Sequence, residues 1–219
     1  MFKNIILFSS LLFLITCAYN GIDVSYWQGN NVNFNKVKAA GRTFVVMRAG
    51  IGLSEDVYFQ LNYEKAKEAG LDVGVYWYCQ ALSVEESTAE ANKILSILKG
   101  KQFEYPIYYD IENQSLFNKG KELTSAIAKN FCNISEQNNY FCGIYASKYY
   151  LETYFDDVVK TRYTIWVAQY YDQCTYQGPY KVWQRSSEGH VDGIDGNVDL
   201  DESYADFASI MKAAHLNGF

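Results

Sequence analysis

The chain has 219 residues, of which 49% are hydrophobic and 17% aromatic, and its formal net charge is −6. This length allows one sizeable core and makes a second domain unexpected. Because Lys and Arg form no runs, the sequence argues against nucleic-acid binding, which needs clustered cations to neutralise phosphates.

The first residues have the pattern of a secretory signal. Lys3 is followed by an apolar run from Ile5 to Ile15, which is too short to span a bilayer but fits a signal-peptide core. The small residues that come next suit cleavage after Ala18. We therefore predict a signal peptide over residues 1–18.

The predicted mature chain is a single domain over residues 19–219, secreted or held in the lumen of a lysosomal or phagosomal vesicle. Cleavage removes Lys3 and leaves 18 basic and 25 acidic residues, so the net charge becomes −7. We expect a monomer without membrane contact. The alternative is a lipid anchor on Cys17, for which Thr16 is a poor preceding residue.

Strand-like runs, rich in β-branched and aromatic residues, recur along the whole mature chain. Helix-like segments separate the first five of these runs. In chain order, the runs are GIDVS (21–25), TFVVMRAG (43–50), DVGVYWYC (72–79), YPIYYDIE (105–112), YFCGIYAS (140–147), YTIWVAQY (163–170), YKVWQRS (180–186) and GIDGNVDLD (193–201).

The helix-like segments carry start and stop signals. Residues 32–41 end in Gly and residues 57–71 contain one just before their end, which is typical of a helix terminus. The next segment opens with Ser83 and Glu86, the pattern of a capping box, and stops at Gly100. Further helices are expected over residues 119–139, 147–155 and 205–219.

This alternation of strands and helices predicts a mostly parallel sheet covered on its outer face. About eight strands in roughly 200 residues favour a closed barrel. The later connections, residues 171–179 and 187–192, are too short for full helices. The predicted fold class is therefore α/β: an irregular, TIM-like β/α barrel with reduced helices in its second half.

Carboxylates stand at the ends of several predicted strands. Asp23 closes the first strand, and Asp199 lies in the last. Asp110 and Glu112 end the fourth strand, and because side chains two apart on a strand share a face, they point the same way. In such barrels the active site lies at the C-terminal ends of the strands, so the four acids are expected to meet in one mouth.

Four carboxylates in an apolar, aromatic cup cannot all be ionised, because desolvation and mutual repulsion raise the pKa of at least one. A protonated acid beside a carboxylate is the arrangement that glycoside hydrolysis uses. The acid protonates the leaving oxygen, while the carboxylate stabilises an oxocarbenium-like transition state or activates water. The 20 Tyr and 4 Trp residues suit stacking against sugar faces.

A metal site is an alternative use of these acids, since clustered Asp and Glu also bind Ca²⁺ or Mg²⁺. The segment GNVDLDES (196–203) lacks the spacing of an EF-hand loop. Zinc has no support, because the chain has no CxxC and only two histidines, His190 and His215. We therefore expect no metal and no other cofactor. A second alternative is that Asp110 and Glu112 are only a solvated loop pair, which is what an isolated Asp-x-Glu motif would by itself suggest.

Five ordered sequence blocks strengthen the glycosidase interpretation: GIDVSYWQG (21–29), YYDIE (108–112), GIYAS (143–147), IWVAQY (165–170) and VWQRSSEGHVDGIDGNVDLDES (182–203). The set resembles glycoside hydrolase family 25, the muramidase-type lysozymes. The resemblance implies an irregular β/α barrel that cleaves the β-1,4 bond between N-acetylmuramic acid and N-acetylglucosamine. Bacterial peptidoglycan is then the expected partner.

The resemblance also implies roles for individual residues. Glu112 matches the general acid, and Asp110 the second acid of the same motif. Asp23 and Asp199 match two further carboxylates of the cleft, with Asp201 the fallback for Asp199 because it shares the same strand face. The resemblance does not choose between an acid acting as base and the substrate's own acetamido group acting as nucleophile. Looser matches to substrate-binding positions are Tyr76, Tyr78, Tyr145, Gln169 and Trp183.

The function expected from the resemblance is a secreted lysozyme that degrades bacterial walls in defence or digestion. Its acidic net charge suggests an acidic compartment, where partial protonation lessens repulsion from an anionic wall. Two other functions stay open. A chitinase-like glycosidase also ends a central strand with an acidic motif, and an inactive carbohydrate-binding relative would keep the aromatic residues but lose an acid.

The cysteines of the mature chain are even in number, which predicts two disulfides in a secreted protein, with three possible connectivities. Spacing favours a local bridge between Cys132 and Cys142, joining a helix to the strand after it. Cys79 and Cys174 would then pair with each other.

Two sequons are legal acceptors for N-glycosylation, NQS at Asn113 and NIS at Asn133. A glycan on Asn113 would stand next to Glu112 and block the cleft. We therefore expect Asn133 to be the better acceptor.

Overall fold

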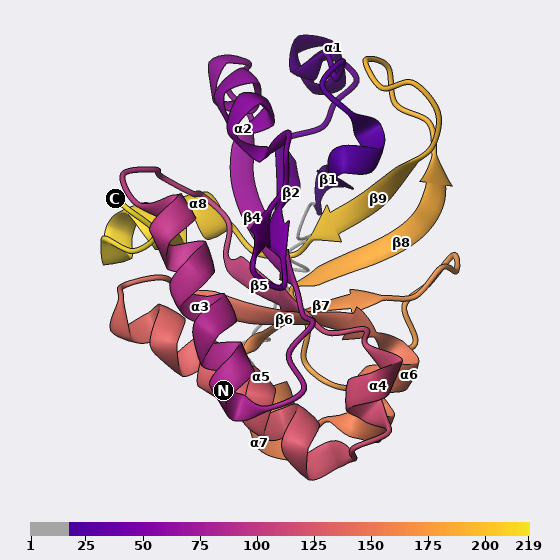
Figure 1. Cartoon of the computed structure of the whole chain (residues 1–219). Helices are drawn as coiled ribbons and strands as arrows, with labels where there is room; N and C mark the ends of the chain where they lie inside the picture. The colour runs from indigo at the N-terminus through magenta and orange to yellow at the C-terminus, as the bar shows by residue number, and fades with distance from the viewer. Residues whose placement is uncertain (1–17) are drawn as a thin grey trace, which may run out of the picture.

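Eight strands close into a barrel in the structure, a computed structural model that describes residues 18–219 (Figure 1). The barrel closes because β1 pairs with β2, and β9 runs antiparallel between β1 and β8 while the other barrel strands are parallel. This confirms the predicted α/β barrel. The strands are β1 (Tyr19–Val24), β2 (Phe44–Ile51), β4 (Asp72–Tyr78), β5 (Ile107–Asp110), β6 (Cys142–Ser147), β7 (Thr164–Ala168), β8 (Val182–Gly189) and β9 (Val198–Ser203), with the short β3 (Ser54–Glu55) beside β2.

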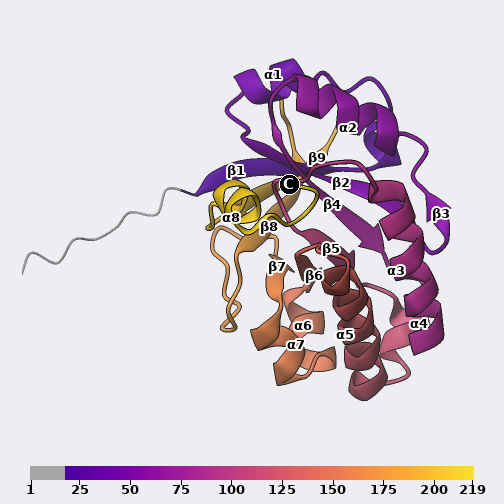
Figure 2. The ribbon, with the colours of Figure 1, turned by 90° about the vertical axis from the view of Figure 1, so that its left-hand side faces the viewer.

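The helices thin out along the chain, as the short later connections predicted. Figures 1 and 2 show the long helices α3 and α5 side by side on one flank of the barrel, whereas no helix follows β7 or β8 before the next strand. No helix in residues 18–219 is long and apolar enough to cross a membrane. The helices are α1 (Phe34–Ala39), α2 (Phe59–Glu68), α3 (Val84–Leu98), α4 (Gln114–Phe117), α5 (Lys121–Gln137), α6 (Lys148–Tyr154), α7 (Asp157–Arg162) and α8 (Phe207–Ala214), together with a 3₁₀ turn at Tyr26–Gln28.

The start of α3 shows how the sequence pattern works and where it departs from expectation. The hydroxyl of Ser83 accepts the backbone N–H of Glu86 at 3.2 Å, as a capping box requires. The Glu86 carboxylate, however, accepts the N–H of Leu82 at 2.6 Å rather than that of Ser83. The cap therefore satisfies two backbone donors, as predicted, but one of them belongs to Leu82, the residue before the N-cap Ser83.

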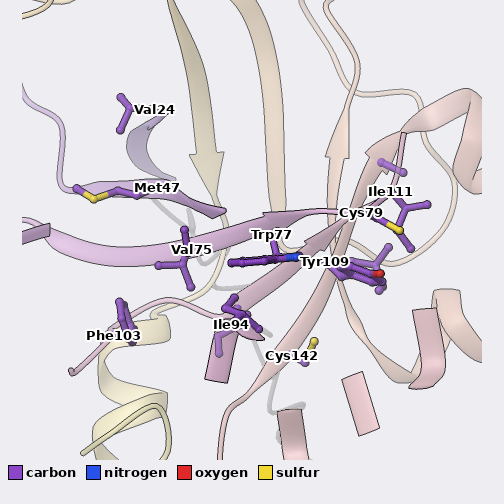
Figure 3. Packing of buried hydrophobic residues seen from close by; sticks show 14 of the residues in the cluster. Val24, Met47, Val75, Trp77, Cys79, Ile94, Phe103, Tyr109, Ile111 and Cys142 are labelled. Carbon is purple, nitrogen blue, oxygen red and sulfur yellow. The ribbon is translucent and has the colours of Figure 1, made fainter. Parts of the chain in front are cut away.

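Two layers of apolar side chains hold the barrel. The outer layer lies between strands and helices, and Figure 3 shows Val75 and Trp77 of β4 in it with Ile94 of α3. The inner layer fills the barrel with large aromatic rings, which need glycine on neighbouring strands. A Cβ on Gly143 would come within 2.7 Å of the Tyr108 ring. Tyr108 is fully buried there, so the lower barrel is a packed core and not a channel.

The C-terminal segment closes the end of the barrel opposite the strands' C-termini. Phe207 and Met211 of α8 pack into the inner layer, where the Phe207 ring lies 5.2 Å from that of Tyr105 between centroids. Beyond the helix, Asn217 is completely buried. Its side chain accepts the N–H of Phe141 at 2.7 Å and donates to the carbonyl of Tyr105 at 2.8 Å. The segment is therefore part of the fold and not a loose tail.

Replacing Asn217 with alanine is expected to lower the free energy of unfolding by about 2–4 kcal/mol, because two buried backbone groups lose their partners. Asn217 also has a φ of 55°, a conformation that asparagine tolerates better than alanine. Chemical denaturation measures the change. Asn118→Ala is the matched control, since this exposed residue accepts only a side-chain hydrogen bond from Gln114. Equal stabilities of the two variants would contradict the prediction.

The four described cysteines are free in the structure, so neither predicted disulfide is formed. Pairing of Cys79 with Cys174 is wrong: Cys79 is buried next to Glu90, whereas Cys174 lies half-buried beside Tyr180. Cys132 on α5 and Cys142 at the start of β6 do come together, with their sulfur atoms 2.7 Å apart and no bond between them.

Two groups of predictions concern processing of the chain: the N-terminal signal or anchor, and the two glycosylation sequons. The signal peptide and the anchor on Cys17 fall on residues 1–17, outside the described part of the chain. The sequons differ in setting: Asn133 is exposed on α5, while Asn113 is half-buried and caps α4 by accepting the N–H of Ser115 at 2.9 Å.

Candidate active site

A cavity of about 250 Å³ opens at the C-terminal ends of the barrel strands. All four carboxylates singled out in the sequence line it: Asp23, Asp110, Glu112 and Asp199. They come from β1, β5, the residues after β5, and β9, which the closure of the barrel brings to one rim.

Asp110 and Glu112 owe their common direction to the strand period. Asp110 is the last residue of β5, and the N–H of Ile111 continues the ladder by donating to the carbonyl of Tyr145 at 3.0 Å. Ile111 is fully buried in the outer layer, so its two neighbours both face the cavity. Asp110 is only 4% exposed, while Glu112 is half-buried at the entrance.

Asp23 and Asp199 are direct partners across the antiparallel pair of β1 and β9. The carboxylate of Asp23 accepts the side-chain N–H of Gln184 at 2.7 Å. Gln184 is itself held by the hydroxyl of Tyr145, which donates to its Oε1 at 2.7 Å. Three strands thus fix the position of Asp23, which is 5% exposed.

The five predicted substrate-binding residues separate into three groups. Tyr76, Tyr78 and Tyr145 line the cavity. Gln169 lies in an adjoining hollow of about 600 Å³ that shares Glu112 with the cavity. The structure places Trp183 in neither, because it points to the outer face of β8, where its indole N–H donates to a backbone carbonyl.

Sequence reasoning missed other residues of the wall. Trp27, which follows the first strand, is 76% exposed at the mouth of the cavity, and Tyr170 stands between the cavity and the adjoining hollow. Both belong to the quoted blocks GIDVSYWQG and IWVAQY, so their position just after a strand end was the available signal. Exposed rings in a polar cleft suit stacking on sugars.

Arg48 supplies a positive charge to the cavity. Its guanidinium forms an ion pair with the buried Asp56 at 2.7 Å and stacks over the ring of Tyr26, with 4.5 Å between the guanidinium carbon and the ring centroid. Because both partners fix it, Arg48 remains beside Asp110. Burial, and then Glu112, raises the pKa of Asp110 well above its ordinary value, and the charge of Arg48 offsets part of that rise.

The cavity shifts the protonation of its acids. Burial, and then the neighbouring Asp199, raises the pKa of Glu112 above its ordinary value. Burial raises the pKa of Asp199 to about 6, against a hydrogen bond from Asp23 that lowers it. Both carboxyls therefore hold a proton more readily than exposed acids do, and their mutual repulsion favours a state in which only one of the two is ionised.

A proton donor, a carboxylate and stacking rings in one cleft suit general acid catalysis on a glycosidic bond. The described residues contain no group of three or more side chains that could hold a metal ion.

Comparisons with known proteins bear on this site. Residues 22–194 match the family described as Glycosyl hydrolases family 25, a segment that includes three of the four carboxylates but stops before Asp199. The chain is 29% identical to an autolytic lysozyme of Clostridium acetobutylicum over 184 residues, covering 83% of this chain and 55% of that protein. It is 25% identical to lysozyme M1 of Streptomyces globisporus, covering 91% of this chain and 72% of that one.

Solved structures share the fold. The modular autolysin LytC of Streptococcus pneumoniae, solved in complex with a synthetic peptidoglycan ligand, superposes with a TM-score of 0.79 at 26% identity, over 85% of this chain and 46% of that one. A bacterial lysozyme of Streptomyces coelicolor superposes with a TM-score of 0.74 at 24% identity, over 89% of this chain and 96% of that one. The chain thus spans about half the length of the clostridial and pneumococcal proteins.

Proposed function

The chain belongs to the glycosyl hydrolases family 25, and we propose that it is a muramidase that hydrolyses the β-1,4 bond between N-acetylmuramic acid and N-acetylglucosamine in bacterial peptidoglycan. The observation that carries this proposal is the convergence of four carboxylates and two exposed rings, Trp27 and Tyr170, on one cavity. The peptidoglycan ligand of the pneumococcal structure supports the same substrate class.

In the proposed reaction, Glu112 donates its proton to the glycosidic oxygen as the bond from that oxygen to the sugar carbon breaks. The leaving sugar departs with the proton as a new hydroxyl group. Asp110 stabilises the positive charge that develops on the ring. Water finally adds its oxygen to the sugar carbon and gives one proton to a carboxylate of the cavity, so that the product carries a new hydroxyl group. Both routes left open by the sequence, an acid as base or the acetamido group as nucleophile, use Glu112 in this way.

Analysis of the new reducing ends tests the proposal. Purified peptidoglycan is digested, and the products are reduced with borohydride and hydrolysed. A muramidase leaves N-acetylmuramic acid at the new reducing ends, and borohydride reduces this sugar to its alditol. Cleavage of the other glycosidic bond leaves N-acetylglucosamine there, which gives the glucosamine alditol instead. Release of the glucosamine alditol alone would contradict the proposal.

The two alternatives give different outcomes in the same assay. A chitinase-like enzyme would shorten chitin oligomers and leave peptidoglycan intact. An inactive binding protein would sediment with insoluble peptidoglycan and release no fragments. The presence of all four acids in one cavity favours hydrolysis over binding alone.

We further propose that the protein is secreted or delivered to an acidic vesicle, where it degrades bacterial walls, and that Cys132 and Cys142 form a disulfide there. Their sulfur atoms lie 2.7 Å apart, so little movement is needed for a bond. In thiol–disulfide exchange, the two thiols give two protons and two electrons to an oxidising disulfide, which becomes two thiols.

The mature protein, purified from the medium without reductant, is expected to begin at Tyr19 and to be lighter than the reduced form by two hydrogen atoms. Peptide mapping should join Cys132 to Cys142, and alkylation after unfolding should modify Cys79 and Cys174. Retention of residues 1–18, or alkylation of all four thiols, would contradict this proposal.

A further inference from the structure

Asp201 is a fully buried carboxyl directly beneath the cavity. It lies two residues after Asp199 on β9 and therefore points into the barrel, one layer deeper. Its cross-strand partners are Gln184 on β8 and Gly21 on β1. A Cβ on Gly21 would lie 2.3 Å from the Phe44 ring, which therefore packs against this position. Asp23 lies two residues further along β1, on the same face of the strand.

The hydrogen bonds of Asp201 leave part of the carboxyl unsatisfied. Its Oδ1 accepts the indole N–H of Trp166 at 2.9 Å. Its Oδ2 is buried and, among the described residues, accepts no hydrogen bond from an amide, indole or hydroxyl group. Burial of a carboxylate oxygen that has no hydrogen-bond donor costs free energy. Asp201 therefore needs either a hydrogen bond from a neighbouring group or a proton of its own.

The neighbour is another carboxyl. Burial raises the pKa of Asp23, and the charges of Asp199 and Asp201 and a hydrogen bond to Asp201 raise it further. The second oxygen of Asp23, Oδ2, already accepts the side-chain N–H of Gln184. Two buried carboxyls in hydrogen-bonding contact cannot both be ionised, and one proton between them satisfies both.

Other charged or titratable groups face Asp201 from the elements packed around it. Burial, and then Asp199 on its own strand, raises the pKa of Asp201 to about 8, although hydrogen bonds and the charge of Arg42, before β2, act against the rise. Tyr108 on β5 also faces Asp201: burial and Tyr105 raise the pKa of Tyr108, and the charge of Asp201 adds to that rise. Arg42 attracts the charge of Asp201, but its Nε is without a hydrogen-bond partner among the described residues, and no salt bridge joins the two side chains there.

We propose that Asp201 is a positioning residue that shares one proton with Asp23, so that the two carboxyls together carry a single negative charge beneath the cavity. The proton stays on this pair at pH values where a solvent-exposed aspartate is ionised. Asp23 then carries less than a full negative charge next to Asp199, which helps Asp199 to stay ionised in the cleft. This last consequence for catalysis rests on the proposed function, whereas the shared proton does not.

The Asp201→Asn variant tests the shared proton directly. The amide keeps an oxygen for Trp166 and offers an N–H to Asp23, which stabilises the Asp23 carboxylate. The carboxyl carbon of Asp23 is followed by ¹³C NMR in the substrate-free protein and identified by its absence in Asp23→Asn. Its titration midpoint is expected to fall by about one pH unit or more in Asp201→Asn.

Glu202→Gln is the matched control, since it removes a carboxylate from the next position of β9, on the opposite face, where Glu202 pairs with Arg185. It is expected to leave the Asp23 midpoint unchanged. Equal midpoints in wild type and Asp201→Asn would overturn the proposal. If Asp201→Asn does not fold, the carboxyl carbon of Asp201 is titrated in wild type and in Asp23→Asn, where the same coupling must appear.

The pH profile of kcat/KM on peptidoglycan tests the catalytic consequence. With Asp23 ionised, Asp199 faces an additional like charge that raises its pKa, so the acidic limb should move to higher pH in Asp201→Asn and not in Glu202→Gln. A shifted NMR midpoint with no hydrolysis by the wild type would refute the proposed function and support the shared proton. An unshifted midpoint would refute the shared proton, whatever the activity.

Discussion

Glu112→Gln is expected to reduce kcat on peptidoglycan about 10²–10⁴-fold, the range typical of a lost general acid. Glutamine has nearly the same shape and hydrogen-bonding reach, but it has no acidic proton for the leaving oxygen. Since Glu112 stands half-exposed at the cavity entrance, the variant should keep the fold and the thermal midpoint of the wild type. Turbidity clearing of purified peptidoglycan and thermal unfolding measure the two properties.

The pH dependence follows from the raised pKa of Glu112. The protonated form is the active one, so the wild-type rate should fall as the pH rises through that pKa. On the acid side, the rate should fall as Asp199, with its pKa of about 6, takes up a proton. The residual activity of Glu112→Gln should lack the alkaline limb. An optimum above neutrality in the wild type would count against this assignment and against work in an acidic vesicle.

Glu122→Gln serves as the control for this experiment. Glu122 is exposed in the first turn of α5 and lines neither the cavity nor the adjoining hollow, so the same chemical change there should leave the rate as in wild type. If Glu112→Gln cleared walls as fast as Glu122→Gln, Glu112 would not be the acid.

Asp110→Asn is the second variant with a large expected effect, a loss of about 10²–10³ in kcat. Asp110 is buried, and its Oδ1 accepts no hydrogen bond within the described chain. Burial, and then Glu112, raises the pKa of Asp110, and the charge of Arg48 offsets part of that rise. In its ionised form this carboxylate can act on a positive charge that develops on the sugar. The neutral amide cannot stabilise that charge.

An aryl glycoside of the same sugar separates the two roles. Its phenolate leaves without protonation, so Glu112→Gln should recover most of its rate on this substrate, while Asp110→Asn should remain slow. The exposed Asp192→Asn is the control for removal of an aspartate charge. Recovery of Asp110→Asn on the aryl substrate would mean that Asp110, and not Glu112, protonates the leaving group.

The site shows which properties follow from local sequence. The common face of Asp110 and Glu112 follows from the strand period alone, and their place at a strand end follows from the run of strand formers before them. The barrel itself was predictable because strands and helices alternate at a regular spacing. The reduced second half was evident from connections too short for helices.

Other properties depended on how distant segments pack. The same alternation that exposes Gln184 to the cavity turns Trp183 away from it, and a one-residue choice of register decides between the two. The pairing of Cys79 with Cys174 failed for a related reason: sequence spacing carries no information on which strand ends become neighbours.

Sequence by itself determined which residues could be acids of a glycosidase and on which side of each strand they lie, because side-chain direction repeats every two residues along a strand. Only the tertiary structure decided that β9 returns antiparallel beside β1, which makes Asp199 the partner of Asp23 at the rim and places Asp201 in the dry interior below. Depth of burial and the distance between carboxyls control which one keeps a proton, and both arise when the barrel closes.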